Sequence, residues 1–450
     1  MAIRTKPRGY QLEAAERCVK QEGRFAIHFK AGTGKTLAAL LCSEKLKART
    51  ILIFCSPSAI YEVWERQINL HIRGGKAIYF DVDSFQENNK RNYLILSYGI
   101  GKNIYTKLRR KFDLFIVDES HRMSKRGTQQ SRRINSIAQV TPYHVQLTGD
   151  PIRKDELDLY GQYRAIDKDL LGTYEEFFAE YGTRGKKLAP FVFMEFFNKA
   201  KKDQLIELLA PYTADQDADL KFMPKELPNN FVGFDLPNKA VKIYRDILKD
   251  MLYECDEFEV APDIALTRDL RLAQITSGFV TDDDDNIQRI HNAKIKAYED
   301  WYENFSTKEQ LITFYRFKPE REDLHKLLPK AEIIEGGQKT TDRAAIIRGF
   351  RERKFKDLHI QIQAGGESID GLQEHCHYGM FYSCNYSYVD NNQCRARLVR
   401  DGQKHPVGFW YMQARRTIDQ RIFKLIQSKK STSEDYRKAM REYLLTSLVA

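Results

Sequence analysis

The sequence predicts an α/β protein with two parallel-sheet lobes in tandem and a mainly helical insert between them. Short, continuously apolar runs recur in the first and last thirds of the chain, separated by sequences typical of helices. Continuous apolar runs favour strands buried on both faces, as in a parallel sheet covered by helices. The middle of the chain has helical periodicity broken by prolines, which favours helices joined by linkers. We expect lobe 1 at residues 1–165, the helical insert and linker at 166–290, and lobe 2 at 291–450.

The apolar runs place the strands of each lobe. The expected strands of lobe 1 are residues 25–29, 51–55, 77–80, 93–96, 113–117 and 143–147. Those of lobe 2 are residues 311–315, 331–334, 358–362, 378–382 and 407–412. With 450 residues, of which 42% are hydrophobic, the chain is long enough to form more than one core.

The composition limits the compartment and the partners. Lys and Arg number 73 against 62 Asp and Glu, a formal net charge of +11. This excess indicates a polyanionic partner, although it fits a basic protein without one equally well. The seven cysteines form no CxxC pair and are odd in number, as in a reduced intracellular protein. No export signal or membrane-spanning run is visible, so we expect a cytoplasmic protein with no membrane partner.

A phosphate-binding loop follows the first expected strand. Residues 30–36 have the sequence KAGTGKT and precede an apolar helical segment. Gly32 and Gly34 allow backbone N–H groups to turn toward a phosphate, and the helix N-terminus adds partial positive charge. Lys35 can reach the β- and γ-phosphates, and the Thr36 hydroxyl can bind Mg²⁺. The strict form of this motif has glycine where this chain has Phe29.

Two adjacent carboxylates follow the strand expected at residues 113–117. Asp118 and Glu119 stand at the carboxyl end of a buried strand, where α/β sheets bind ligands. Asp118 would hold Mg²⁺, directly or through water, and Glu119 would polarise the attacking water. The alternative interpretation is an acidic turn that caps a helix. The phosphate loop upstream favours the catalytic interpretation.

The order of the motifs resembles superfamily 2 helicases and translocases with Swi/Snf-type motifs, whose second motif is DExx, here DESH at residues 118–121. Four further segments carry the resemblance: RGYQ at 8–11, LTGDPI at 147–152, AGGESIDGLQ at 364–373 and QCRARLVRDGQ at 393–403. The last matches the sixth-motif pattern QxxxRxxRxGQ, and Asp150 replaces the usual Thr of LTGTPI. The resemblance covers residues 8–423 and implies two RecA-like lobes that use ATP and Mg²⁺.

The resemblance also implies a role for each matched residue. Gln11 would hydrogen-bond the adenine base, and Arg397 and Arg400 would be arginine fingers, an effect worth ~10³–10⁵ in rate. The implied catalytic residues are Lys35, Asp118, Glu119, Gln393, Arg397 and Arg400. The implied ATP-binding residues are Gln11, Gly32, Thr33, Gly34, Lys35 and Thr36, with Thr36 and Asp118 at the metal. The implied coupling residues are Thr148, Gly366 and Asp370, and Ser56 resembles a residue that grips a phosphodiester. The arginines could also form a solvated basic face, but the GQ pair and flanking strands favour fingers.

The insert contains an aromatic-rich segment around a basic glycine loop. Residues 173–197 carry the aromatics, and residues 182–187 form the loop. Aromatics interleaved with basic residues can stack bases at a DNA junction. Aromatics at helical spacing are more often core, and we expect this for most of these rings. The DNA contacts we expect from the loop are Arg184, Lys186 and Lys187.

The chain is close to two lobes plus one insert, which resembles compact phage branch-migration helicases of the UvsW type. This implies an ATP-dependent DNA helicase or translocase that acts on forks and four-way junctions in recombination, repair or replication. The alternatives are a double-stranded DNA translocase without strand separation, an RNA helicase and a non-hydrolysing module. The sixth motif with its GQ argues against the RNA helicase. The intact Lys35, Glu119 and Arg400 argue against a module without chemistry. The sequence does not identify a protein partner.

Overall fold

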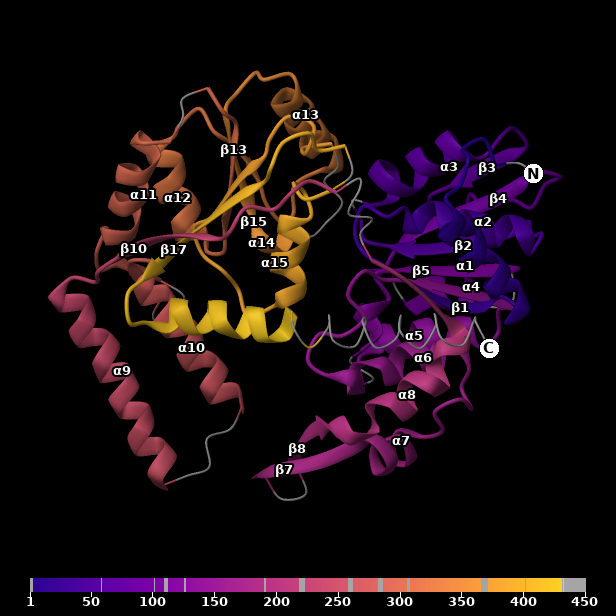
Figure 1. Cartoon of the computed structure of the whole chain (residues 1–450), viewed down its shortest axis with the longest axis horizontal. Helices are drawn as coiled ribbons and strands as arrows, with labels where there is room; N and C mark the ends of the chain where they lie inside the picture. Colours follow the sequence, from indigo (N-terminus) through magenta and orange to yellow (C-terminus); the bar gives the residue numbers. More distant parts are fainter. Residues whose placement is uncertain are drawn as a thin grey trace. The chain divides into compact units, whose positions relative to one another are not determined.

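The computed structural model describes residues 3–432 apart from several short gaps. The gaps are residues 58, 101, 109–111, 125–126, 190–191, 218–222, 258–261, 282–285, 306–307, 366–370, 401 and 431. The chain divides into two compact units (Figure 1). Unit 1 comprises Met1–Thr183, Glu195–Phe222 and Lys429–Ala450, and unit 2 comprises Arg184–Met194 and Met223–Ser428.

Unit 1 is built on a parallel sheet of seven strands in the order β3-β4-β2-β5-β6-β1-β9. The strands are β1 (Arg24–Phe29), β2 (Thr50–Cys55), β3 (Lys76–Tyr79), β4 (Arg91–Ser97), β5 (Leu114–Asp118), β6 (Tyr143–Leu147) and β9 (Thr213–Gln216). All their pairings are parallel. The six strands expected for lobe 1 are therefore confirmed, to within one or two residues at their ends.

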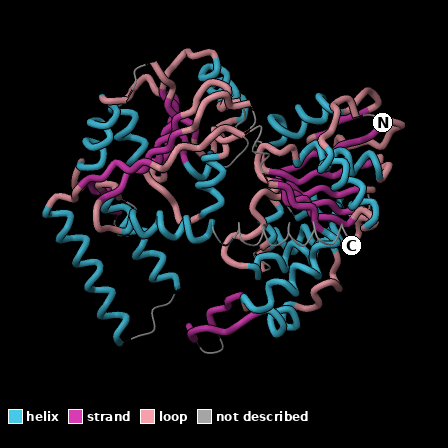
Figure 2. The backbone as a smooth tube through the Cα atoms, in the orientation of Figure 1, coloured by secondary structure: helices cyan, strands magenta, loops and turns pink. Residues whose placement is uncertain are grey.

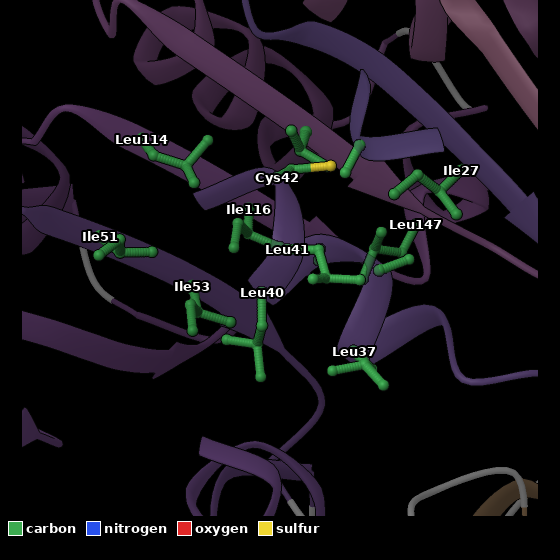
Figure 3. Close-up of a cluster of buried hydrophobic side chains, with 14 of the residues drawn as sticks. Ile27, Leu37, Leu40, Leu41, Cys42, Ile51, Ile53, Leu114, Ile116 and Leu147 are labelled. Carbon is green, nitrogen blue, oxygen red and sulfur yellow. The ribbon is translucent and has the colours of Figure 1, made fainter. Parts of the chain in front are cut away.

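Helices cover both faces of this sheet because its strands present apolar side chains on both sides. One core contains Ile51 and Ile53 with α1 (Gly9–Lys20), α2 (Lys35–Lys45) and α3 (Arg66–His71). Leu52 and Phe54 belong to the opposite core with α4 (Lys102–Leu108), α5 (Gln129–Ala138) and α6 (Leu159–Ile166). Figure 3 shows the first core, where Leu37, Leu40 and Leu41 of α2 meet side chains from the strands.

Unit 2 repeats the design with a sheet of six strands in the order β10-β17-β16-β13-β15-β14. They are β10 (Asn230–Phe234), β13 (Leu311–Tyr315), β14 (Glu332–Ile334), β15 (Asp357–Gln361), β16 (Tyr378–Phe381) and β17 (Gly408–Ala414), and all pairings are parallel. One face packs on α11 (Ala293–Glu303) and α12 (Lys318–Leu327), the other on α13 (Thr340–Arg351) and α15 (Tyr388–Arg395). The expected architecture of two RecA-like lobes in tandem is confirmed.

The expected helical insert, residues 166–290, is divided between the two units. It contains α7 (Tyr174–Tyr181), α8 (Lys202–Leu209), α9 (Asn238–Glu257) and α10 (Pro262–Thr276). It also contains the hairpin of β7 (Gly182–Ala189) and β8 (Val192–Phe197) and the pair β11 (Phe279–Thr281) and β12 (Ile287–Arg289). Figure 2 shows these helices and strands in separate colours. Strands β9 and β10 of the segment 166–290 are edge strands of the two sheets. An edge strand needs no continuous apolar run.

Short helical turns complete the described chain. They are η1 (Ile60–Glu65), a π-helix, and the 3₁₀ turns η2 (Ser120–Met123), η3 (Glu156–Asp158), η4 (Lys199–Lys201) and η5 (Ala210–Tyr212), with the short helix α14 (Ile362–Gly365). No helix among the described residues is long and apolar enough to cross a membrane.

Candidate active site at the carboxyl edge of unit 1

The phosphate loop connects β1 to α2. Gly32 and Gly34 have φ angles of 81° and 79°, in the left-handed region that glycine adopts without strain. The Thr33 hydroxyl donates to the Lys30 carbonyl over 2.6 Å and closes the turn. Helix α2 begins at Lys35, so the loop ends at a helix N-terminus, which favours anion binding.

Two side chains of helix α1 form hydrogen bonds with this loop. The Tyr10 hydroxyl donates to the Thr33 carbonyl over 2.8 Å, and the Gln11 Nε2 lies 3.2 Å from the carbonyls of both Thr33 and Gly34. Because the C=O and the next N–H of a peptide plane point in opposite directions, carbonyls fixed toward α1 turn N–H groups of the loop away from it. The Gln11 amide, for which the resemblance implied a contact with adenine, is bonded to the loop in this structure.

Phe29, the departure from the strict motif, has a structural role. Its side chain is only 1% exposed, and its ring packs edge-on against Tyr10 with centroids 5.3 Å apart. The residue therefore lies in the core and supports the tyrosine that holds the loop. A glycine at this position would leave that tyrosine without its apolar neighbour.

Asp118 lies at the end of β5 with a donor at each carboxylate oxygen. The indole N–H of Trp64 donates to Oδ2 and the Glu119 backbone N–H to Oδ1, both over 3.0 Å. Trp64 is fully buried and belongs to the π-helix η1, an element often found at functional sites. Burial and the neighbouring Glu119 charge raise the pKa of Asp118 to about 6, although Lys35 and Trp64 oppose this rise.

Glu119 has the left-handed φ of 53° and is held by His121. Its Oε2 lies 3.2 Å from the His121 Nδ1, which also lies 3.1 Å from the Thr148 hydroxyl. Burial acts to raise the pKa of Glu119, but His121, Lys35 and Arg122 outweigh it and lower that pKa to about 2. Glu119 therefore stays ionised.

The LTGDPI segment, residues 147–152, begins at the last residue of β6 and borders the phosphate loop. A Cβ atom added to Gly149 would stand 3.3 Å from the Lys35 Nζ and 3.5 Å from the Phe29 carbonyl oxygen. The Thr148 backbone N–H donates to the Ile27 carbonyl of β1 over 3.1 Å, and its hydroxyl accepts from the Asp150 N–H. Strands β5, β6 and β1 are neighbours, so the phosphate loop, the two carboxylates and Thr148 meet at one edge.

Four residues that support this site had no assigned role in the sequence analysis. They are Tyr10, Trp64, His121 and Gln162, whose Oε1 accepts from the Ser120 hydroxyl over 2.9 Å. Tyr10 and His121 lie inside segments that the motifs already marked, so adjacency was an available signal. Trp64 and Gln162 act across 54 and 42 residues of sequence, and no local pattern indicates such contacts.

The predicted site residues of unit 2 lie around α15. Gln393 is in that helix and half-buried, and Arg397 and Arg400 follow in the turns after it. The Gln403 Nε2 donates to the Cys376 carbonyl over 2.8 Å and anchors the GQ end of the segment. Gly366 and Asp370 lie outside the described residues.

The predicted DNA contacts are placed as follows. Ser56 directly follows β2 and is 7% exposed. Arg184, Lys186 and Lys187 lie in strand β7, so the expected glycine loop is wrong: its backbone pairs with β8. Glycines are rare in strand sequences, which explains why a loop was expected. The side chains of Lys186 and Lys187 lie outside the description.

Comparisons with known proteins show that the chain is similar to proteins of the helicase type. Residues 4–153 match the family described as "Type III restriction enzyme, res subunit". That segment contains the phosphate loop, Asp118, Glu119 and Thr148.

Three relatives match larger shares of the chain. "Putative protein p41" of Acyrthosiphon pisum secondary endosymbiont phage 1 is 25% identical over 73% of this chain and 73% of its own length. The "SWI/SNF-related matrix-associated actin-dependent regulator of chromatin subfamily A-like protein 1 homolog" of Caenorhabditis elegans is 25% identical over 39% of this chain and 27% of its own length. The "Putative ATP-dependent helicase/translocase YwqA" of Bacillus subtilis is 19% identical over 90% and 45%. The chain spans less than half of these last two proteins.

Among solved structures, the Sulfolobus solfataricus SWI2/SNF2 ATPase core in complex with dsDNA aligns with 98% of this chain and 97% of its own, at 17% identity and a TM-score of 0.44. The family match and the named relatives confirm the resemblance to superfamily 2 helicases with Swi/Snf-type motifs. The match to this family and the relative named a helicase/translocase support ATP hydrolysis by this chain.

Proposed function

We propose that this chain is an ATP-dependent DNA helicase or translocase that acts on branched DNA, such as forks and four-way junctions. The observation that carries the proposal is the contact network of unit 1, in which Glu119 and Thr148 share one nitrogen of His121. Through His121 the network connects Glu119, which we expect to direct the attacking water, with Thr148, which we expect to couple nucleotide state to the path of the nucleic acid.

The residues at the carboxyl edge of unit 1 fit a nucleoside triphosphate with Mg²⁺. Asp118 is half-buried beside the Glu119 carboxylate, and burial and the Glu119 charge raise its pKa, an environment that a bound cation would stabilise. The Thr36 hydroxyl and Asp118 would hold the metal, which supplies positive charge to the phosphate oxygens when bound. Lys35 and the loop N–H groups would hold the phosphates. Glu119, with its low pKa, orients the attacking water by accepting its hydrogen bond.

Arg397 and Arg400 are the proposed arginine fingers, with Gln393 beside them in sequence. They belong to unit 2 and the phosphate loop to unit 1, so hydrolysis would need both units at one nucleotide. ATP would then favour the closed arrangement and hydrolysis would release it. If each unit holds the phosphodiester backbone, this cycle moves one contact past the other and tolerates any sequence.

DNA is the proposed substrate because the chain carries an excess of basic residues, the family match is to a restriction-enzyme subunit and a relative is named a helicase/translocase. The phage relative, which covers 73% of this chain, supports a phage origin and hence the host cytoplasm. Branched DNA is supported by the resemblance of the motifs to phage branch-migration helicases and by the phage relative. The alternative is a translocase on double-stranded DNA without strand separation.

The test compares ATP turnover with single-stranded DNA, duplex, fork, four-way junction and RNA at one salt concentration. The proposal expects the highest turnover with forks or junctions and unwinding of the same substrates. Lys35→Ala and Glu119→Gln should abolish turnover and leave DNA binding intact. Highest turnover with RNA would refute the DNA substrate, and turnover on duplex without unwinding would favour the translocase.

A further inference from the structure

Unit 2 contains a pocket of about 910 Å³ at the amino ends of β13, β14 and β15. Gln310 and Lys356, which directly precede β13 and β15, line it, as does Glu332, the first residue of β14. Parallel sheets bind their ligands at the carboxyl edge, and five-residue strands place that edge ~16 Å away. The pocket therefore lies at the other edge of the sheet from Gln393, which is in helix α15 after β16.

The pocket is rich in positive charge. Five basic residues line it against two acidic ones: Lys308, Lys330, Arg353, Lys354 and Lys356 against Glu332 and Asp357. Among the ion pairs of the described residues, only Lys354 of these five has a partner, Glu352 at 2.8 Å. Lys308, Lys330 and Arg353 form none with a described residue.

The two acidic residues compensate this charge poorly. Asp357 accepts a hydrogen bond from the Tyr302 hydroxyl over 2.6 Å, and burial raises the pKa of this carboxyl. The Lys356 ammonium lies 4.7 Å from the centre of the Tyr302 ring, which attracts a cation without neutralising it. The pocket thus gathers more cations than carboxylates, and this excess favours the binding of an anion.

The backbone that carries these cations is held in place. The Gln310 Nε2 donates to the Phe350 carbonyl over 2.8 Å and to the Phe355 carbonyl over 3.1 Å. A Cβ atom at Gly349 would come within 2.9 Å of the Phe355 ring, so helix α13 packs closely on the turn. The basic side chains therefore extend from an ordered turn.

We propose that this pocket binds the phosphodiester backbone of a DNA segment. The three cations that form no ion pair with a described residue come from three connections, those preceding β13, β14 and β15, so a chain of phosphates offers a separate partner to each. DNA carries one charge per ~1.7 Å of axis and can meet several of them together. The inference rests on the proposed function in one respect, that the motor's substrate is DNA. It adds a contact at the amino edge of the sheet of unit 2.

The test is the salt dependence of DNA binding without nucleotide. The variant Lys308→Gln/Lys330→Gln/Arg353→Gln removes three cations, and each phosphate contact contributes ~0.9 to the slope of log affinity against log salt. We expect the slope for a long linear duplex to decrease by about 2 to 3. The matched control, Lys20→Gln/Lys47→Gln/Lys296→Gln, changes the net charge equally at exposed positions elsewhere and should change the slope much less.

A slope equal to that of the wild type, or to that of the control, would overturn the proposal. So would loss of polyglutamate binding in the pocket variant with an unchanged DNA slope, because the pocket would then fit an acidic protein. Failure of the proposed function looks different: the wild type would show no preference for branched DNA in turnover, whereas the slope measurement uses linear duplex and no ATP.

Discussion

Trp64→Phe should separate metal use from nucleotide binding at the candidate active site. The substitution keeps an aromatic ring in the fully buried position but removes the N–H that donates to the Asp118 Oδ2 over 3.0 Å. A hydrogen bond to a charged group contributes ~1.5–3 kcal/mol, equivalent to about 10-fold to 150-fold in an equilibrium or rate constant. Asp118 would keep only the donor on Oδ1 and would lose its fixed orientation.

The assay is ATP hydrolysis against Mg²⁺ concentration at saturating DNA, with binding of a fluorescent nucleotide in EDTA as the second measurement. We expect the product of the decrease in turnover and the decrease in Mg²⁺ affinity to be about 10-fold to 150-fold. Nucleotide binding without metal should be unchanged. Trp301→Phe is the control, because Trp301 lies in α11 of unit 2 and packs on Phe305. If Trp64→Phe and Trp301→Phe give the same Mg²⁺ curve, the assigned role of the indole is wrong.

Three further predictions concern the loop and the core. Gly34→Ala should abolish nucleotide binding, because its Cβ would stand 2.4 Å from the Gln11 Nε2 at a φ of +79°; normal binding in equilibrium dialysis would contradict the loop geometry. Lys294→Met should destabilise unit 2 by ~3–5 kcal/mol, because it leaves the fully buried Glu320 without the cation 3.1 Å away; a loss below about 1 kcal/mol in urea unfolding would show that the pair is solvated. Burial lowers the pKa of His359 to about 3, so its contribution to stability is present above the unfolded pKa and is lost as the pH falls. Lowering the pH from about 7.5 to about 5 should therefore reduce the free energy of unfolding by ~2 kcal/mol. His359→Leu should remove that part of the pH dependence.

The strands of both lobes could be predicted from sequence because most residues of a strand buried on both faces are apolar. The runs at residues 51–55 and 311–315 correspond to β2 and β13. Strand β9, with the sequence TADQ, could not be predicted in this way: it has one neighbour, β1. Its place in the sheet depends on a pairing with residues almost 190 positions earlier.

In the candidate site too, residues within short motifs could be predicted, whereas contacts between residues far apart in sequence could not. The glycines of the loop and the carboxylates after β5 are fixed by local geometry, so short motifs indicate them. The bond from Trp64 to Asp118 spans 54 residues and depends on how η1 packs against the sheet. The role of Phe29 also required its contact with Tyr10, because the motif alone marks that residue only as a departure.

The return of the chain to the first sheet at β9 has a practical consequence for expressing parts of this protein. A fragment that ends at residue 165, the boundary expected from sequence, would lack β9 and leave β1 as an unpaired edge next to the phosphate loop. It would also lose the hydrogen bond between the Tyr163 and Thr213 hydroxyls, at 2.5 Å, and the ion pair between Lys30 and Asp217. An exposed apolar edge strand is a template for aggregation. A fragment that keeps residues through Asp217 should stay monomeric where the shorter one precipitates.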